Sequence, residues 1–278
     1  MNEMNNNTQL KRIGGSPGNA LSNNFTLNSN DVLQEAWELT KTTKPPFLLG
    51  ALIIYLIALG SSFILEPLQP EIGNLEELET IPWMLVFSQL AMQVVVAVLL
   101  AGLISMGLRN AVRHVKSSDG EQTVVPNNSP NMVFSHFSGA WPIAAIEVIK
   151  MVGILALVVL AVTLATPLGL TINTLFAILL IISLTLAVGL SLAIPLVIKD
   201  HLSPIKAMRI SLTVVFRRLF TFLSIYAVLS ILFILSLFTL GIGLIWTIPL
   251  FYNAKGIIYR EIFGIETHVI TKNEPLGI

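Results

Sequence analysis

The feature that most limits how this chain can fold is a series of continuous apolar runs, several of which reach about twenty residues. A helix needs roughly 20 apolar residues to span the hydrocarbon core of a bilayer. Only 12% of the residues are charged and the mean hydropathy is +0.79. A soluble domain carries about 25% charged residues, so this chain has too few to cover a water-facing surface. The sequence therefore predicts an all-α fold, a polytopic bundle of membrane helices.

The apolar runs predict six transmembrane helices that pair as three helical hairpins. A short amphipathic cytoplasmic helix precedes each hairpin, opening at Asp31, at Ser129-Pro130 and at Ser203-Pro204. Serine at the N-cap with proline in the first turn is typical of a helix start. We expect Pro45 and Pro46 to break the first amphipathic helix before the first span. The predicted spans are about Phe47–Leu65, Ile81–Leu108, Ile143–Thr166, Thr171–Ile198, Leu219–Leu237 and Leu244–Ile258.

Composition divides the chain into three parts. Residues 1–29 are rich in Asn, Ser, Gly and Thr, and we expect them to form a disordered cytoplasmic tail. Residues 30–265 form the predicted six-span membrane domain, and residues 266–278 a short cytoplasmic tail. The first 45 residues are mostly polar, so we expect no cleavable signal peptide and assign the first span as the insertion signal.

The distribution of lysine and arginine predicts the orientation. In the six-span arrangement these residues fall on one side, and the other side, which includes the acidic segment 66–80, carries none. Cytoplasmic loops of membrane proteins are enriched in lysine and arginine. Both termini are therefore predicted to be cytoplasmic.

Four polar residues within the apolar runs form a candidate intramembrane polar site. Gln89 and Gln93 share a helix face, and they either line a polar cavity or form hydrogen bonds between packed helices. Glu147 and Lys150 lie three residues apart and can form an ion pair. Ionisable residues in membranes are costly and often functional, but this pair lies near the cytoplasmic end of its span, where a long side chain reaches the surface. Both interpretations stay open.

The segment Lys199–Arg218 predicts an amphipathic helix with cations on its polar face, which is typical of a segment at a membrane surface. These cations are candidate contacts for lipid headgroups, anionic ones among them, or they serve only to orient the chain. The residues are Lys206, Arg209, Arg217 and Arg218. Pro195, Pro249 and Asn253 lie near cytoplasmic span ends, where they either open a binding site or end the helices.

The search for catalytic chemistry finds no HExxH, GxSxG, P-loop or GxGxxG pattern. There is no cysteine, and the four histidines show no metal-ligand spacing. The net charge of zero gives no indication of nucleic-acid binding. We therefore predict no enzymatic activity, no catalytic residue, no metal and no cofactor.

A set of residues stands out in the last third of the chain: Ser203, Pro204, Ala207, Ser211, Gly241, Gly243, Pro249, Tyr259 and Arg260. With this set, the chain resembles the YciC-like inner-membrane proteins of unknown function and the membrane domain associated with glycerophosphodiester phosphodiesterases. It implies a six-span protein of the bacterial cytoplasmic (inner) membrane and carries over no catalytic residue.

Three functions fit these patterns. The first is a non-enzymatic membrane protein that engages lipids or has an envelope-associated role, with membrane lipids as partners. The second is a membrane scaffold or assembly factor, with the Asn-rich tail as a tether. The third is a small-solute transporter.

Overall fold

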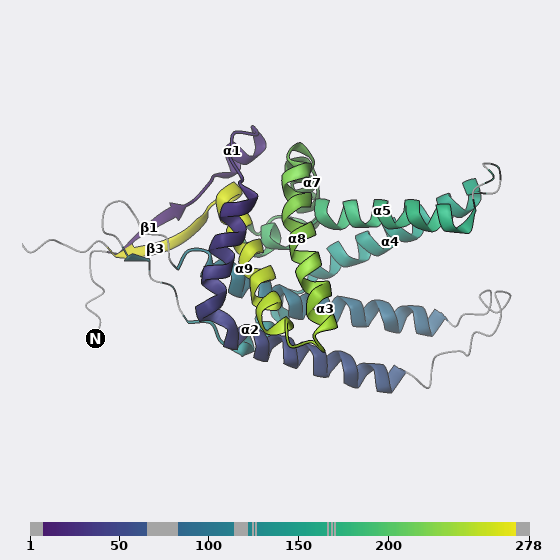
Figure 1. Ribbon diagram of the computed structural model, residues 1–278, viewed down its shortest axis with the longest axis horizontal. Coiled ribbons are helices and arrows are strands. Elements are labelled where there is room, and N and C mark those ends of the chain that lie inside the picture. Colours follow the sequence, from purple (N-terminus) through teal and green to yellow (C-terminus); the bar gives the residue numbers. More distant parts are fainter. Residues whose placement is uncertain are drawn as a thin grey trace, which may run out of the picture. The chain divides into compact units, whose positions relative to one another are not determined.

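The computed structural model (Figure 1) describes residues 8–65, 83–113, 122–123, 125, 127–165, 167, 169 and 171–270. The chain forms two compact units, each built from several sequence segments. Unit 1 comprises Met1–Leu49, Leu103–Met132 and Thr213–Ile278, and unit 2 comprises Gly50–Gly102 and Val133–Leu212. The acidic segment 66–80 lies outside the described residues.

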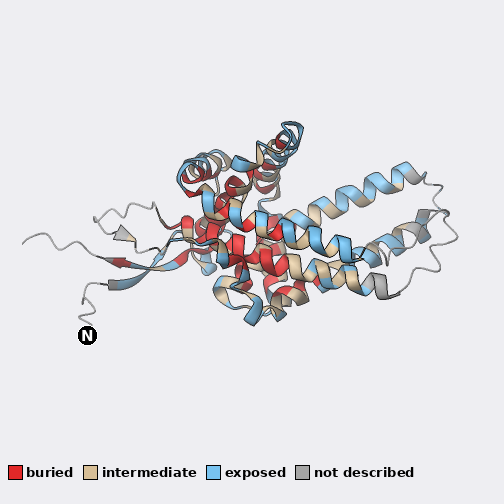
Figure 2. Cartoon of the chain, turned by 90° about the horizontal axis from the view of Figure 1, so that it is seen from below, coloured by how far each residue is buried: buried red, intermediate tan, exposed pale blue. Residues whose placement is uncertain are grey.

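Five long apolar helices among the described residues confirm the predicted class, an all-α polytopic membrane protein. Four of them are α2 (Ser29–Leu65), α3 (Trp83–Asn110), α4 (Trp141–Ala165) and α8 (Leu219–Phe238). The fifth run comprises α5 (Ile172–Gly189) and α6 (Ala193–Asp200). Most of these helices are exposed along their apolar runs, whereas buried residues gather on α9 and the elements packed against it (Figure 2). Exposed apolar helices of this length are suited to hydrocarbon rather than water.

Helix α9 (Leu244–Phe263), predicted as the sixth span, differs from these five. It is not among the described helices that are long and apolar enough to cross a membrane. From Asn253 onward it carries the polar residues Asn253, Lys255 and Arg260, and most of this part is buried within unit 1. Helix α8 packs against it as an antiparallel neighbour.

The prediction that Pro45 and Pro46 end the first amphipathic helix is wrong, because α2 continues through both prolines. Proline removes a backbone donor and usually kinks or breaks a helix. Contacts with α9 hold the chain on both sides of this point. Asn253 Nδ2 donates to Thr43 Oγ1 at 3.2 Å before the prolines, and Phe47 stacks on Tyr252 after them. Tertiary packing thus overrides the local preference.

Residues 8–29 are folded, which corrects the prediction of a disordered tail for this part of residues 1–29. Strand β1 (Thr8–Ile13) pairs antiparallel with β3 (Ile265–Ile270), and β2 (Gln122–Thr123) pairs with the other edge of β3. Helix α1 (Pro17–Leu21) follows, with the Ser16 side chain as its N-cap. Strand β3 also occupies part of the predicted tail 266–278. The polar composition of this segment does not predict its ordered structure, because that structure depends on pairing with a strand about 250 residues away.

Unit 2 contains a break within the predicted fourth span, Thr171–Ile198. Helix α5 ends at Gly189 and α6 begins at Ala193. Ser211 of α7 (Pro204–Arg217) stabilises the break, because its Oγ donates to Gly189 O at 2.7 Å and accepts from Leu192 N at 3.2 Å. A side chain from a packed helix thus satisfies backbone groups that the break frees.

The predicted helix starts at the two Ser-Pro pairs are confirmed. Helix α7 begins at Pro204. Ser129-Pro130 opens the short 3-10 helix η3 (Pro130–Phe134), which is followed by η4 (Phe137–Gly139). Helices α4 and α5 of unit 2 pack together as a hairpin.

Candidate functional site

The polar residues of unit 1 converge on α9, where α3 crosses it at two glycines. A Cβ on Gly256 would lie 2.2 Å from Gly107 O, and a Cβ on Gly107 would lie 2.0 Å from Tyr252 O. Both distances are shorter than any real contact, so only glycine permits this approach of the two backbones. The close crossing brings the end of α3 against the polar face of α9.

A fully buried asparagine, Asn253, joins three segments beside this crossing. Its Oδ1 accepts from Asn110 Nδ2 at 2.9 Å, and its Nδ2 donates to Thr40 Oγ1 and to Thr43 Oγ1, both at 3.2 Å. Asn128 Nδ2 extends the chain by donating to Asn110 Oδ1 at 2.9 Å. Buried polar groups are costly unless they are hydrogen-bonded. This network therefore fixes the register of α2, α3 and α9 in unit 1.

Further along the same face, Arg260 makes the strongest polar contacts of α9. Its Nη1 and Nη2 donate to the two Glu35 oxygens at 2.5 and 2.7 Å, and its Nε and Nη2 donate to Glu261 Oε1 at 2.9 and 2.6 Å. Nη1 also donates to Ala111 O at 2.5 Å. Burial alone lowers the pKa of the guanidinium, but the hydrogen bonds and charge attraction of Glu35, and then of Glu261, outweigh it and raise the pKa. Arg260 therefore stays protonated.

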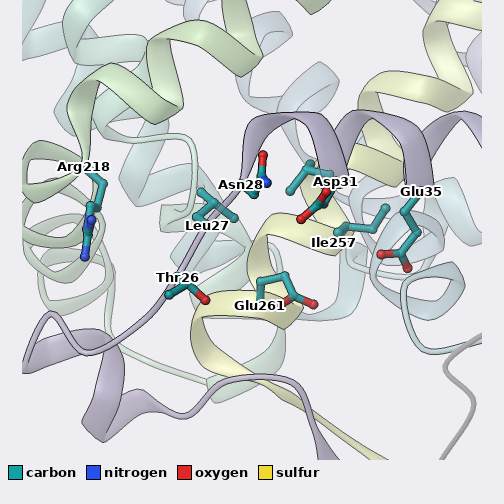
Figure 3. A pocket seen from close by; sticks show the side chains of 9 residues that line it. Thr26, Leu27, Asn28, Asp31, Glu35, Arg218, Ile257 and Glu261 are labelled. Carbon is teal, nitrogen blue, oxygen red and sulfur yellow. The ribbon is translucent and has the colours of Figure 1, made fainter.

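A groove opens next to the contacts of Arg260 with Glu35 and Glu261. It lies between the start of α2 and the segment where α7 meets α8 (Figure 3). We define the charged groove as this hollow of about 410 Å³, lined by Thr26, Leu27, Asn28, Asp31, Val32, Glu35, Arg218, Ile257 and Glu261. Figure 3 shows Arg218 on one side and the three carboxylates on the other, with Leu27 and Asn28 between them. A second hollow of about 470 Å³ adjoins it and shares Thr26, Arg218 and Glu261.

The charges of the charged groove are not equally available to a ligand. Arg260 already holds Glu35 and Glu261. Arg218 keeps an exposed side chain, with Nη2 3.4 Å from Phe25 O and its guanidinium carbon 5.7 Å from the centre of the Phe25 ring. Asp31 is exposed in the first turn of α2. The groove thus offers one cation and one anion on opposite walls.

The four predicted lipid contacts separate into two kinds. Lys206 and Arg209 are exposed on the first part of α7, in unit 2. Arg217, the last residue of α7, and Arg218, the N-cap of α8, belong to unit 1 and contact the N-terminal segment. Arg217 Nη1 donates to Leu21 O, and Arg218 reaches Phe25 and lines the charged groove. Of the predicted cations, only Arg218 lines this hollow.

The four predicted intramembrane polar residues do not form one site. Gln89 and Gln93 are exposed on α3. On α4, Lys150 Nζ donates to both oxygens of Glu147 at 2.9 Å, so the ion pair that their spacing allows is present. Glu147 is buried, at 4% exposure. The pair neutralises a carboxylate that would otherwise be costly inside the protein.

Pro195 and Pro249, the two prolines predicted near cytoplasmic span ends, fall in different settings. Pro195 lies in the first turn of α6, just after the break, and Pro249 lies inside α9.

A third hollow, of about 340 Å³, lies in unit 2 and brings His136 and His201 together with Ser135 and Ser138. Within the described ranges, no group of three or more metal-ligating side chains forms.

The sequence patterns did not reveal the carboxylates of the charged groove. Glu35 and Arg260 are separated by 225 residues, so no local pattern links them. A weaker signal was present on α9, because Asn253, Gly256 and Arg260 recur at helical spacing and fall on one face of the helix.

Comparison with known proteins gives no relatives: no family model, no curated protein and no solved structure matches the chain.

Proposed function

We propose that this polytopic membrane protein binds the headgroup of a zwitterionic phospholipid in the charged groove, which we call the headgroup groove from here on. The observation that carries the proposal is the position of Arg218, which lines the groove and directly precedes the apolar helix α8. Cations that flank an apolar membrane helix lie at the level of the lipid headgroups. A headgroup phosphate is then within the depth that Arg218 reaches.

The second charge of the groove selects the class of headgroup. Asp31 faces Arg218 across the hollow, as Figure 3 shows. Arginine binds phosphate through charge-assisted hydrogen bonds, and a carboxylate accepts hydrogen bonds from a primary ammonium. A phosphoethanolamine headgroup carries both groups. The non-enzymatic lipid-engaging role is therefore the function that these residues support best, with no catalytic residue and no cofactor.

The sidedness of the chain is part of the proposal. We infer that both termini lie on the cytoplasmic side of a bacterial inner membrane, because the lysines and arginines fall on the side of the termini. The pairing of β1, β2 and β3 in one sheet supports this, since strands of one sheet lie on one side of a membrane. The chain then crosses the membrane an even number of times between those strands. Six crossings in three hairpins, as the apolar runs predict, satisfy this condition, and so do four.

Binding of defined lipids to the purified protein, followed by native mass spectrometry, tests the headgroup groove. Phosphatidylethanolamine should bind more tightly than phosphatidylcholine or phosphatidylglycerol. Arg218→Gln and Asp31→Asn each remove a hydrogen bond to a charged group, which is worth about 1.5–3 kcal/mol. Since each 1.4 kcal/mol is tenfold in affinity, the Kd should rise by about 10- to 100-fold.

Lys206→Gln is the matched control, because Lys206 is an exposed cation that does not line the groove. Its affinity for phosphatidylethanolamine should equal that of the unaltered protein. The proposal is wrong if Arg218→Gln and Lys206→Gln weaken binding equally, or if phosphatidylglycerol binds as tightly as phosphatidylethanolamine.

A further inference from the structure

The hairpin formed by α8 and α9 carries an inference that does not depend on the headgroup groove. Among the described helices between β2 and β3, three runs are long and apolar enough to span a membrane: α4, α5 with α6, and α8. The sheet requires an even number of crossings between these strands. If α4 and the run of α5 and α6 cross as the two arms of one hairpin, then either α9 also crosses, or α8 does not. The contacts of α9 within unit 1 decide between these two arrangements.

Helix α9 runs along the charged first half of α2, which precedes the apolar run of that helix. Arg260 pairs with Glu35, Asn253 bonds to Thr40 and Thr43, and the Nζ of Lys44 lies 4.8 Å from the centre of the Trp246 ring. Trp246 is the third residue of α9. The start of α9 and its end therefore both lie against a segment on the side of the termini.

This contact is incompatible with a crossing by α9. A helix that crosses the bilayer places its two ends about 30 Å apart along the membrane normal. Trp246 would then lie at the face opposite the termini, whereas Lys44 precedes the first apolar run and stays on the side of the termini. A cation cannot lie 4.8 Å from a ring at the opposite face.

The tip of the hairpin is nevertheless built for hydrocarbon rather than water. The hairpin carries no charged residue from Leu219 to Ala254. Its apolar side chains at the tip are among the most exposed in the described part of the chain, with Phe238 at 82%, Leu240 at 94% and Ile242 at 61%. Apolar side chains that protrude together mark a membrane or interaction surface.

Most backbone N–H groups of the tip are hydrogen-bonded within the turn and the adjoining helix ends. Thr239 Oγ1 donates to Ser236 O at 2.9 Å and accepts from Gly243 N at 3.2 Å. Five successive N–H groups donate to acceptors within the turn and the adjoining helix ends, those of Gly241, Ile242, Gly243, Leu244 and Ile245. Non-helical backbone in hydrocarbon needs internal partners, because no water is there to supply them. Five consecutive N–H groups of this turn have such internal partners.

We propose that α8 and α9 form a re-entrant hairpin, whose tip Thr239–Gly243 inserts into the acyl chains of the leaflet on the side of the termini and does not cross. Four crossings remain, by α2, α3, α4 and the run of α5 and α6. The partner of the tip is the hydrocarbon of a single leaflet. A hairpin of this kind occupies area in one leaflet only.

Single cysteines test this arrangement, because the chain has no cysteine of its own. Leu240→Cys reports on the tip, Ser22→Cys on the side of the termini, and Asn74→Cys on the predicted opposite side. Each variant is exposed to a membrane-impermeant maleimide in intact cells, in inverted membrane vesicles and in detergent. Leu240→Cys should react only in detergent, Asn74→Cys already in intact cells, and Ser22→Cys in inverted vesicles but not in intact cells.

Reaction of Leu240→Cys in intact cells would show a crossing hairpin, and its reaction in inverted vesicles would show a hairpin in water; either result overturns the proposal. A fluorophore on the same cysteine in proteoliposomes gives an independent reading of depth. Phospholipids with spin labels on their acyl chains should quench it, while aqueous iodide should not. Ile242→Cys provides a second tip position if Leu240→Cys does not fold.

Discussion

Arg260 offers the sharpest test of how unit 1 is held together. Its guanidinium is buried and donates to Glu35, Glu261 and Ala111 O. Arg260→Gln would leave two carboxylates without a cation and one buried carbonyl without its donor. Removing one partner of a buried ion pair costs about 3–5 kcal/mol. The side chains of Glu35 and Glu261 are 35% and 39% exposed, so water screens part of this, and we expect about 2–3 kcal/mol.

Thermal unfolding of the purified protein in detergent measures this loss. A change of 1 kcal/mol shifts Tm by roughly 2–4 °C in a protein of this size class, so Arg260→Gln should lower Tm by about 5–10 °C. The double variant Glu35→Gln with Arg260→Gln removes one of the unpaired charges and should be more stable than Arg260→Gln alone. A Tm within about 1 °C of the unaltered protein for Arg260→Gln would refute the reasoning.

The pH dependence of Arg260→Lys completes the test. The raised pKa of Arg260 means that its contribution is fully present below the unfolded-state pKa and is lost only as the pH rises through the folded-state pKa. The unaltered protein should therefore lose none of this stability between about pH 7 and pH 10. A lysine titrates near 10.4, so Arg260→Lys should lose stability from about pH 10 upward. Equal pH profiles for the two proteins up to about pH 11 would contradict this.

Two further predictions concern backbone contacts. Gly256→Ala places a Cβ 2.2 Å from Gly107 O and should lower Tm or prevent folding, with an overpacking cost of about 3 kcal/mol. Gly153→Ala in α4 is its control, because no atom lies within 4 Å of that Cβ, and its Tm should not fall. Ser211→Ala should destabilise the protein by about 1–2 kcal/mol and speed hydrogen exchange at the Leu192 amide, since it removes both bonds at the break of α5 and α6. Ser224→Ala removes only a bond within its own helix and should leave that amide unchanged.

The positions of most helices follow from local sequence. The predicted span Leu219–Leu237 corresponds to α8 (Leu219–Phe238), and Ile143–Thr166 to α4 (Trp141–Ala165). Apolar length and the Ser-Pro helix starts suffice here, because hydrophobic runs and capping act over a few residues. The break before Ala193 escaped this reasoning, since it depends on Ser211 from another helix.

The candidate site was less accessible to sequence reasoning. Arg218 was predicted as one of four candidate lipid contacts of the segment Lys199–Arg218, and it is the one that lines the headgroup groove. Asp31, which lines the same groove, comes from a segment that approaches Arg218 only in the folded chain. The same is true of Glu35 and Arg260, which form an ion pair. Spacing patterns report neighbours along a helix and carry no information on partners that lie far apart in the sequence.

The sequence by itself determined that this chain enters a membrane, because apolar length and scarce charge are properties that no folding can change. Tertiary structure decided the order of residues 8–29, the continuation of α2 through Pro45 and Pro46, and the location of α9. The length of an apolar run indicates only the affinity of that segment for hydrocarbon. Whether a run crosses the bilayer depends on which segment it packs against. For α9 this information comes from the contact of Trp246 with Lys44 of α2.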